Sequence, residues 1–199
     1  MKNGLTVVLV TIVLLGVSAC STTFRGRVID ADTKEPIEGA VVVASWRGEQ
    51  AIGTEMPLKD VKEVLTDKNG EWKIRGPRGT EGGGCISCFT CLTFTYSTRK
   101  PEFIVFKPGY CSYPKGFFID ACKEKMKRGI GDGETTELPK LTNIEDRLRN
   151  FSDFESDSGS GISYKDAVRK QKEFIRLLNE ESRNLGISER KMKELENEK

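Results

Sequence analysis

The chain has 199 residues, with 32 Lys and Arg against 30 Asp and Glu, and it contains no histidine. A net charge this close to zero argues against nucleic acid as a partner and against a polybasic membrane patch, since both need a local excess of positive charge. The missing histidine excludes His-based acid–base chemistry, Ser–His and Cys–His nucleophile pairs and the usual zinc enzyme sites.

The first twenty residues have the pattern of an export signal. Lys2 is followed by an almost unbroken apolar run from Leu5 to Val17. About 20 apolar residues are needed to cross a bilayer, so this run is too short for a spanning helix. We therefore predict a signal peptide over residues 1–19.

The signal ends in Val17-Ser18-Ala19-Cys20, which resembles the lipobox of bacterial lipoproteins. The resemblance implies that the Cys20 sulfur is alkylated with diacylglycerol, that the chain is cut before Cys20, and that the new amine is acylated. Because Ser21 follows Cys20, it also implies the outer membrane, with the protein facing the periplasm or the cell exterior. The alternative is an ordinary secretory signal in which the cysteine falls there by chance.

From Phe24 onward, short runs of β-branched and aromatic residues alternate with turn signals. Asn69-Gly70 is the strongest short-range hairpin signal in the chain. Several short strands at close spacing predict an antiparallel β-sandwich over residues 20–141. The expected strands are Phe24–Ile29, Ala40–Trp46, Val61–Leu65, Glu71–Ile74, Phe103–Phe106 and Glu134–Leu138.

These segments resemble the carboxypeptidase regulatory-like domain, which has a transthyretin-like sandwich fold. The stretches that carry the resemblance are FRGRVIDADTKEPIEGAVVVASW, LTDKNGEWKI and FIVFKPGY. The resemblance implies a module without catalytic residues of its own. The residues that match the family's pattern are Gly26, Val28, Pro36, Gly39, Ala40, Val42, Thr66, Asp67, Gly70, Lys107, Gly109 and Tyr110.

Besides Cys20 the chain has five cysteines, namely Cys85, Cys88, Cys91, Cys111 and Cys122. In an exported chain the first expectation is structural disulfides, and an odd number leaves one spare thiol. The alternatives are a redox-active CxxC and a metal or iron–sulfur site. If residues 85–91 were extended, Cys88 would face away from Cys85 and Cys91. We therefore expect Cys111 and Cys122 each to bond one member of this triplet.

After Leu141 the strand pattern stops. Residues 142–162 are expected to be a linker with a short helix at Asn143–Phe151, and residues 163–199 a helical C-terminal extension. An apolar stripe predicts one helix from Ser163 to Gly186, and a second begins at Ser188. The first helix lies on the sandwich or in solvent, or it binds a partner; in the anchored molecule we expect it to be the free, outward-reaching end.

The sequence therefore predicts a mainly β protein, a transthyretin-like or Ig-like antiparallel sandwich with an α-helical extension. We expect a lipid-anchored cell-envelope protein that is not an enzyme and acts as a binding or scaffolding module for a protein or glycan, with no metal or cofactor. The alternative is a thiol–disulfide or redox-active lipoprotein that uses the CxxCxxC cluster. A hydrolase that uses carboxylates such as Asp67 and Asp120 lacks a motif that places a pair.

Overall fold

The computed structural model describes residues 22–48, 58–77, 100–126, 130, 133–151 and 164–187. Within these residues, strands form at the segments that the alternating patterns predicted, with ends shifted by at most a few residues. They are β1 (Thr23–Asp30), β2 (Val41–Arg47), β3 (Leu58–Leu65), β4 (Glu71–Arg75), β5 (Glu102–Phe106) and β6 (Glu134–Leu138).

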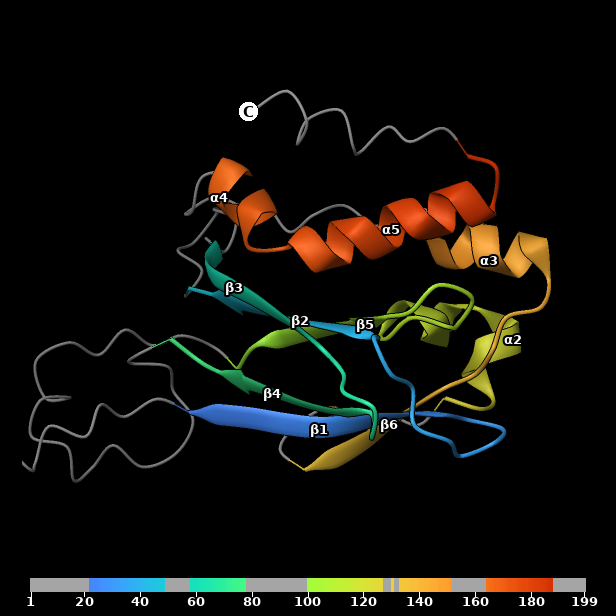
Figure 1. Ribbon diagram of the computed structural model, residues 1–199, viewed down its shortest axis with the longest axis horizontal. Coiled ribbons are helices and arrows are strands. Elements are labelled where there is room, and N and C mark those ends of the chain that lie inside the picture. Colours follow the sequence, from blue (N-terminus) through green and yellow to red (C-terminus); the bar gives the residue numbers. More distant parts are fainter. Residues whose placement is uncertain are drawn as a thin grey trace, which may run out of the picture.

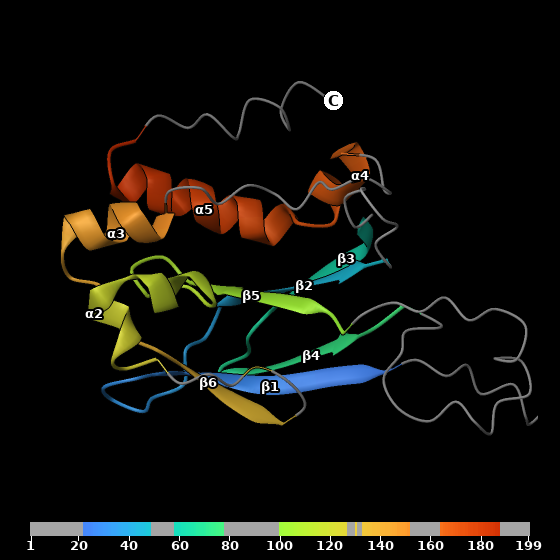
Figure 2. The same cartoon turned by 180° about the vertical axis from the view of Figure 1, so that it is seen from behind.

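The strands form two three-stranded sheets, so the chain is mostly β (Figure 1). Sheet A has the order β4-β1-β6, in which β1 is antiparallel to β4 and parallel to β6. Sheet B has the order β3-β2-β5 and is antiparallel throughout. The helices lie on the side of sheet B that faces away from sheet A and at one end of the sheets (Figures 1 and 2).

The main core lies between the two sheets. Val28 and Trp72 from sheet A and Val42 and Val105 from sheet B are buried in one cluster. Because successive side chains of a strand point to opposite faces, the neighbouring residues of β2 point out of this core, as the sequence predicted. Val41 and Val43 lie in a second cluster, on the outer face of sheet B. Both faces of β2 are therefore covered.

The prediction of a hairpin at Asn69-Gly70 is wrong. The chain does turn there, but β3 belongs to sheet B and β4 to sheet A, so the turn connects the sheets. Residues before the turn bond to the start of β2, and after it the carbonyl of Gly70 accepts from Val28 of β1 at 2.8 Å. Gly70 has φ +73°, and a Cβ there would lie 2.3 Å from the Val28 carbonyl oxygen. The glycine therefore serves a close crossing of the backbone rather than a two-strand ribbon.

The helical segments are η3 (Lys115–Phe118), α2 (Asp120–Lys123), α3 (Ile144–Phe151), α4 (Tyr164–Arg169) and α5 (Lys172–Asn184). The short helix predicted at Asn143–Phe151 is confirmed as α3. The side chain of Asn143 accepts the N–H of Glu145 at 2.9 Å, as a helix-capping residue does. Among the described residues, no helix is long and apolar enough to cross a membrane.

The predicted helix from Ser163 to Gly186 is two helices, α4 and α5, that are separated at Lys170 and Gln171. Gln171 has non-helical dihedral angles and provides no capping side-chain bond. Glu63 of β3 takes that place, because its carboxylate accepts the N–H groups of Glu173 at 2.8 Å and Phe174 at 2.9 Å. The helix therefore restarts at the point where sheet B supplies acceptors for its free N–H groups.

The expectation that the helix is a free, outward-reaching end is also wrong. Phe174, Leu177 and Leu178 of α5 are buried against Val41, Val43, Val61 and Phe106 of sheet B. The rings of Phe106 and Phe174 meet edge to face with centroids 6.0 Å apart. The apolar stripe of α5 thus covers the outer face of sheet B (Figure 1).

Candidate functional site

Two of the five candidate disulfide cysteines, Cys111 and Cys122, bond to each other. The expectation that each would bond a member of the 85–91 triplet is therefore wrong. Cys111 follows β5 and Cys122 lies in α2, and the segment between them folds back so that their Cα atoms are 5.9 Å apart. Both residues are fully buried, so the bridge serves structure rather than exchange with other thiols.

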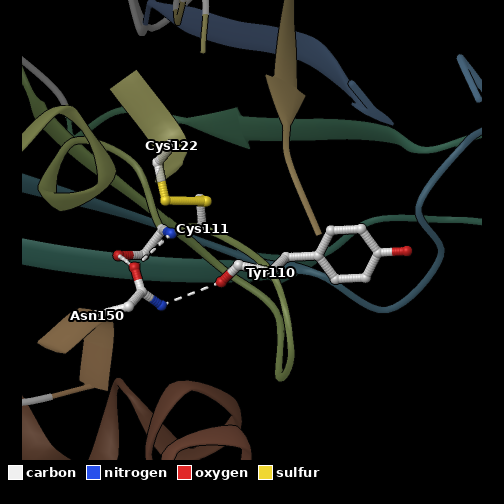
Figure 3. The surroundings of a disulfide bond; sticks show 5 residues. Tyr110, Cys111, Cys122 and Asn150 are labelled. Carbon is white, nitrogen blue, oxygen red and sulfur yellow. Dashed lines mark hydrogen bonds between the residues drawn. A yellow bond between two sulfur atoms is a disulfide. The ribbon is translucent and has the colours of Figure 1, made fainter. Parts of the chain in front are cut away.

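A hydrogen-bonded clamp from α3 lies beside the disulfide (Figure 3). The side-chain oxygen of Asn150 accepts from both the N–H and the hydroxyl of Ser112 at 2.8 Å. Its amide donates to the carbonyl of Tyr110 at 3.0 Å. Asn150 is only 2% exposed, and its side chain forms hydrogen bonds with the residues on both sides of Cys111. The disulfide and this clamp fix α3 to the segment that contains η3 and α2.

A second polar contact holds α3 to α5. Arg147 donates two hydrogen bonds to Glu181, at 2.9 and 2.7 Å, in a bidentate pair. The Glu181 side chain is 2% exposed and that of Arg147 is 21% exposed. A buried carboxylate without its partner would be strongly unfavourable, so this pair fixes the rotation of α3.

Because of these contacts, α3 buries Asn150 and turns two of its apolar side chains outward, while Phe151 at its end packs against the cluster on the outer face of sheet B. Asn150 is buried, whereas Ile144 is 63% exposed and Leu148 is 38% exposed. Ile144 and Leu148 are four residues apart and share one face of the helix. A helix at the surface of a protein normally has the opposite arrangement.

Phe118, at the end of η3, is 88% exposed. Its neighbour Phe117 packs on the main core and meets Tyr113 edge to face, with the ring centroids 5.6 Å apart. Among the described residues, the large hydrophobic side chains that are exposed are Phe118, Ile144 and Leu148, and we call them the apolar contact residues. They lie on the two segments that the disulfide and the Asn150 clamp join.

The motif residues that resemble the carboxypeptidase regulatory-like pattern have structural roles. The Thr66 hydroxyl donates to the Ile37 carbonyl at 2.6 Å and accepts from the Ala40 N–H at 2.9 Å. One Asp67 carboxylate oxygen accepts the N–H groups of Asn69 and Glu71. These atoms are engaged in turns, so both side chains hold the local backbone.

Two further motif residues connect loops. Lys107 donates to the Glu38 carbonyl at 2.9 Å. The Tyr110 hydroxyl bonds the Asp30 carboxylate, and burial together with this negative charge raises the pKa of Tyr110. Burial alone would raise the pKa of Asp30, but two backbone N–H donors and the Tyr110 hydroxyl outweigh burial and hold that pKa below the usual 3.8. Asp30 is therefore an ionised acceptor inside a loop.

The remaining predicted site residues lie outside the described part of the chain. These are the lipidation site Cys20 and the cysteines Cys85, Cys88 and Cys91. In the described part, no three Cys, Asp or Glu side chains gather as a metal ion would require. The apolar contact residues were not predictable from the sequence, because the four-residue spacing of Ile144 and Leu148 does not distinguish an outward from an inward face of the helix.

No family model matches this chain, and no curated protein matches it. A 9R-lipoxygenase from Cyanothece PCC8801 is 16% identical over 43% of this chain and 10% of its own, with a TM-score of 0.23. The shaft pilin spaA from Lactobacillus rhamnosus GG is 9% identical over 62% of this chain and 52% of its own, with a TM-score of 0.28. The chain thus spans a tenth of the first structure and about half of the second. Similarity this low assigns neither a fold family nor an activity.

Proposed function

We propose that this chain is a lipid-anchored protein of the cell envelope, held in the outer membrane through Cys20, that acts as a non-catalytic binding or scaffolding module. Its two-sheet body is a transthyretin-like, Ig-like sandwich of the carboxypeptidase regulatory-like type. The lipobox pattern at residues 17–20 supports the anchor. The structural roles of the family-pattern residues support a module whose motif specifies a fold.

The observation that carries the binding function is the outward-facing apolar pair of α3. Ile144 and Leu148 are exposed, although the helix is fixed by Asn150 and Arg147. Exposing them to water is unfavourable, and the apolar side is removed from water only when something binds to it. Aliphatic side chains and a phenylalanine suit a protein partner better than a glycan.

The anchor is tested on the intact protein in cells. Cys20→Ser should abolish incorporation of a labelled fatty acid and move the protein out of the membrane fraction. Unchanged labelling in this variant would overturn the anchor.

The contact surface is tested by placing a photo-crosslinking residue at Leu148, with Glu180 on the exposed side of α5 as the matched control position. We expect a protein adduct from position 148 and none from position 180, and we expect Ile144→Ser to remove the adduct. Equal adducts from both positions, or an adduct that Ile144→Ser leaves unchanged, would overturn the proposed surface.

A further inference from the structure

The chain enters the two-sheet body at one end and carries α2 and α3 at the other end (Figures 1 and 2). β1 begins at Thr23, and the ring of Phe24 lies with its centroid 6.2 Å from that of Trp46, near the end of β2. The start of β1 and the end of β2 therefore lie together. We call this end of the body the entry end and the opposite one the far end.

The helix that presents Ile144 and Leu148 is fixed to the far end. β1 has eight residues and therefore spans about 25 Å. Its last residue, Asp30, bonds the hydroxyl of Tyr110. The carbonyl of Tyr110 in turn accepts from Asn150 of α3 at 3.0 Å. The length of β1 thus separates these apolar contact residues from the entry end.

This separation determines what the apolar contact residues can reach in the anchored molecule of the proposed function. β1 begins three residues after Cys20, and three residues span at most about 10 Å. The entry end therefore lies at the leaflet that holds the anchor. When the body stands upright on this leaflet, its far end lies about 25 Å beyond the headgroups.

Acidic side chains accompany the apolar contact residues. Asp120 comes two residues after Phe118, and Glu145 directly follows Ile144; both acidic residues are exposed. Each lies in the first turn of its helix, where a negative charge is favourable, so folding explains these positions. Neither carboxylate forms an ion pair within the part of the chain that the structure describes. Their charge is therefore available to a partner.

The basic residues of the same two helices do not cancel this charge. Asp146 is a third carboxylate in α2 and α3 that has no ion pair with a described residue. Arg147 is held by the buried Glu181. Arg149 also has a partner, which leaves Lys123 as the base that faces three carboxylates. The apolar contact residues thus lie in acidic surroundings.

We propose that the apolar contact residues bind a basic, amphipathic segment of a protein in the aqueous compartment. The proposal rests on the contact surface of the proposed function and names the class of its partner. Apolar side chains of the segment would cover Phe118, Ile144 and Leu148, while its Lys or Arg side chains would face Asp120 and Glu145. A tilt that laid the far end on an anionic leaflet would bring carboxylates onto headgroups of the same charge. A second copy of the chain would bring the same carboxylates together.

The test uses the full anchored chain in cells, with the photo-crosslinking residue at Leu148. The contact variant is Asp120→Lys/Glu145→Lys. The matched control, Glu71→Lys/Glu134→Lys, changes the net charge equally at exposed positions of sheet A. A second probe replaces Arg75, which is paired with Thr23 at the entry end, and reports on the leaflet.

We expect the yield of the protein adduct from position 148 to fall about tenfold in the contact variant, because two favourable charge pairs become unfavourable. The control should give the yield of the parent. Mass spectrometry should find the crosslink on a partner peptide that carries Lys or Arg beside apolar residues. Position 75 should give a phospholipid adduct and position 148 none. Both variants should retain the unfolding temperature of the parent.

Equal losses in the two variants would overturn the proposal, because they would reflect net charge alone. A phospholipid adduct at position 148, or an adduct there with a second copy of the chain, would also overturn it. So would the absence of a phospholipid adduct at position 75, since the entry end would then not lie at the leaflet. The proposed binding function fails by a different result, no adduct at all from position 148 in the parent. A protein adduct that the charge reversal leaves unchanged overturns this inference alone.

Discussion

The outer faces of the two sheets differ in composition and in what covers them. The outer face of sheet B presents Val41, Val43 and Phe106 and is covered by α5. The outer face of sheet A presents Arg25 and Lys73, and none of the described helices lies on it. The difference is already present in the strands, because β2 is apolar at every position from Val41 to Ala44 while β1 and β4 alternate. A strand that is apolar on both faces needs two covers, and the C-terminal helices supply the second.

The largest expected effect comes from removing the cover of sheet B. Phe174 is fully buried, so Phe174→Ala should lower the free energy of unfolding by about 3–5 kcal/mol, from lost burial and the cavity left behind. Urea denaturation measures this loss. Arg176→Ala, at an exposed position of the same helix, is the control and should change stability by less than about 0.5 kcal/mol. A loss below about 1 kcal/mol for Phe174→Ala would mean that α5 does not cover the sheet.

The next largest effect concerns the disulfide between Cys111 and Cys122. Cys111→Ala/Cys122→Ala should cost about 3 kcal/mol, because the bridge restricts the unfolded chain over a short loop. Mass mapping of non-reduced peptides should find Cys111 linked to Cys122. A peptide that links either of them to Cys85, Cys88 or Cys91 would contradict the pairing and restore the arrangement expected from the sequence.

Much of the difference between the two sheets was predictable from the sequence, because local signals determine where the strands lie and which of their faces are apolar. Period-two alternation and turn residues located the strands, and the two faces of β2 were assigned correctly from Val41 and Val42. The sheet to which each strand belongs was not predictable at Asn69-Gly70. A turn signal says that the chain reverses, while the choice of partner depends on distant groups such as the Val28 N–H.

The candidate site was largely hidden in the sequence for a similar reason. Ile144 and Leu148 form a predictable stripe, but their outward direction depends on Asn150 meeting Ser112 and on Arg147 meeting Glu181. These contacts join residues far apart in the chain. The pairing of Arg25 with Lys73 was hidden as well, since the two residues look dispersed in a nearly neutral sequence until the register places them opposite each other. Pairwise contacts of high sequence separation leave no periodicity to detect.

Two carboxylates, one in each sheet, are expected to make the stability of the protein depend on pH in opposite ways. Asp30 ends β1 of sheet A, and its pKa is lowered because N–H donors and the Tyr110 hydroxyl outweigh its burial. A lowered pKa adds stability above the unfolded value of 3.8, and this stability is lost as pH falls through the folded pKa. Asp30→Asn should therefore cost about 1 kcal/mol at pH 7 and progressively less as the pH falls below 3.8. A difference from the parent that does not change with pH would contradict this assignment.

Glu63 of sheet B should behave in the opposite way. Burial raises its pKa above 4.5, although two N–H groups of α5 favour its ionised form. A raised pKa gives stability that is complete below pH 4.5 and is lost as pH rises through the folded pKa. The stability of Glu63→Gln relative to the parent should therefore improve between pH 4 and pH 7, as followed by thermal unfolding at each pH. A relative stability that worsens over this range would show that the α5 N-terminus dominates over burial.

The smallest expected effect concerns the pairing of Arg25 with Lys73 in sheet A. Lys73→Glu replaces a like-charge pair with an ion pair to Arg25, and this should raise the free energy of unfolding by a few tenths of a kcal/mol. Lys73→Gln, which removes the repulsion without adding attraction, should lie between the parent and Lys73→Glu in urea titrations. If Lys73→Glu destabilises the sheet, Lys73 contributes to folding in its own right, and the repulsion assigned to this pair is wrong.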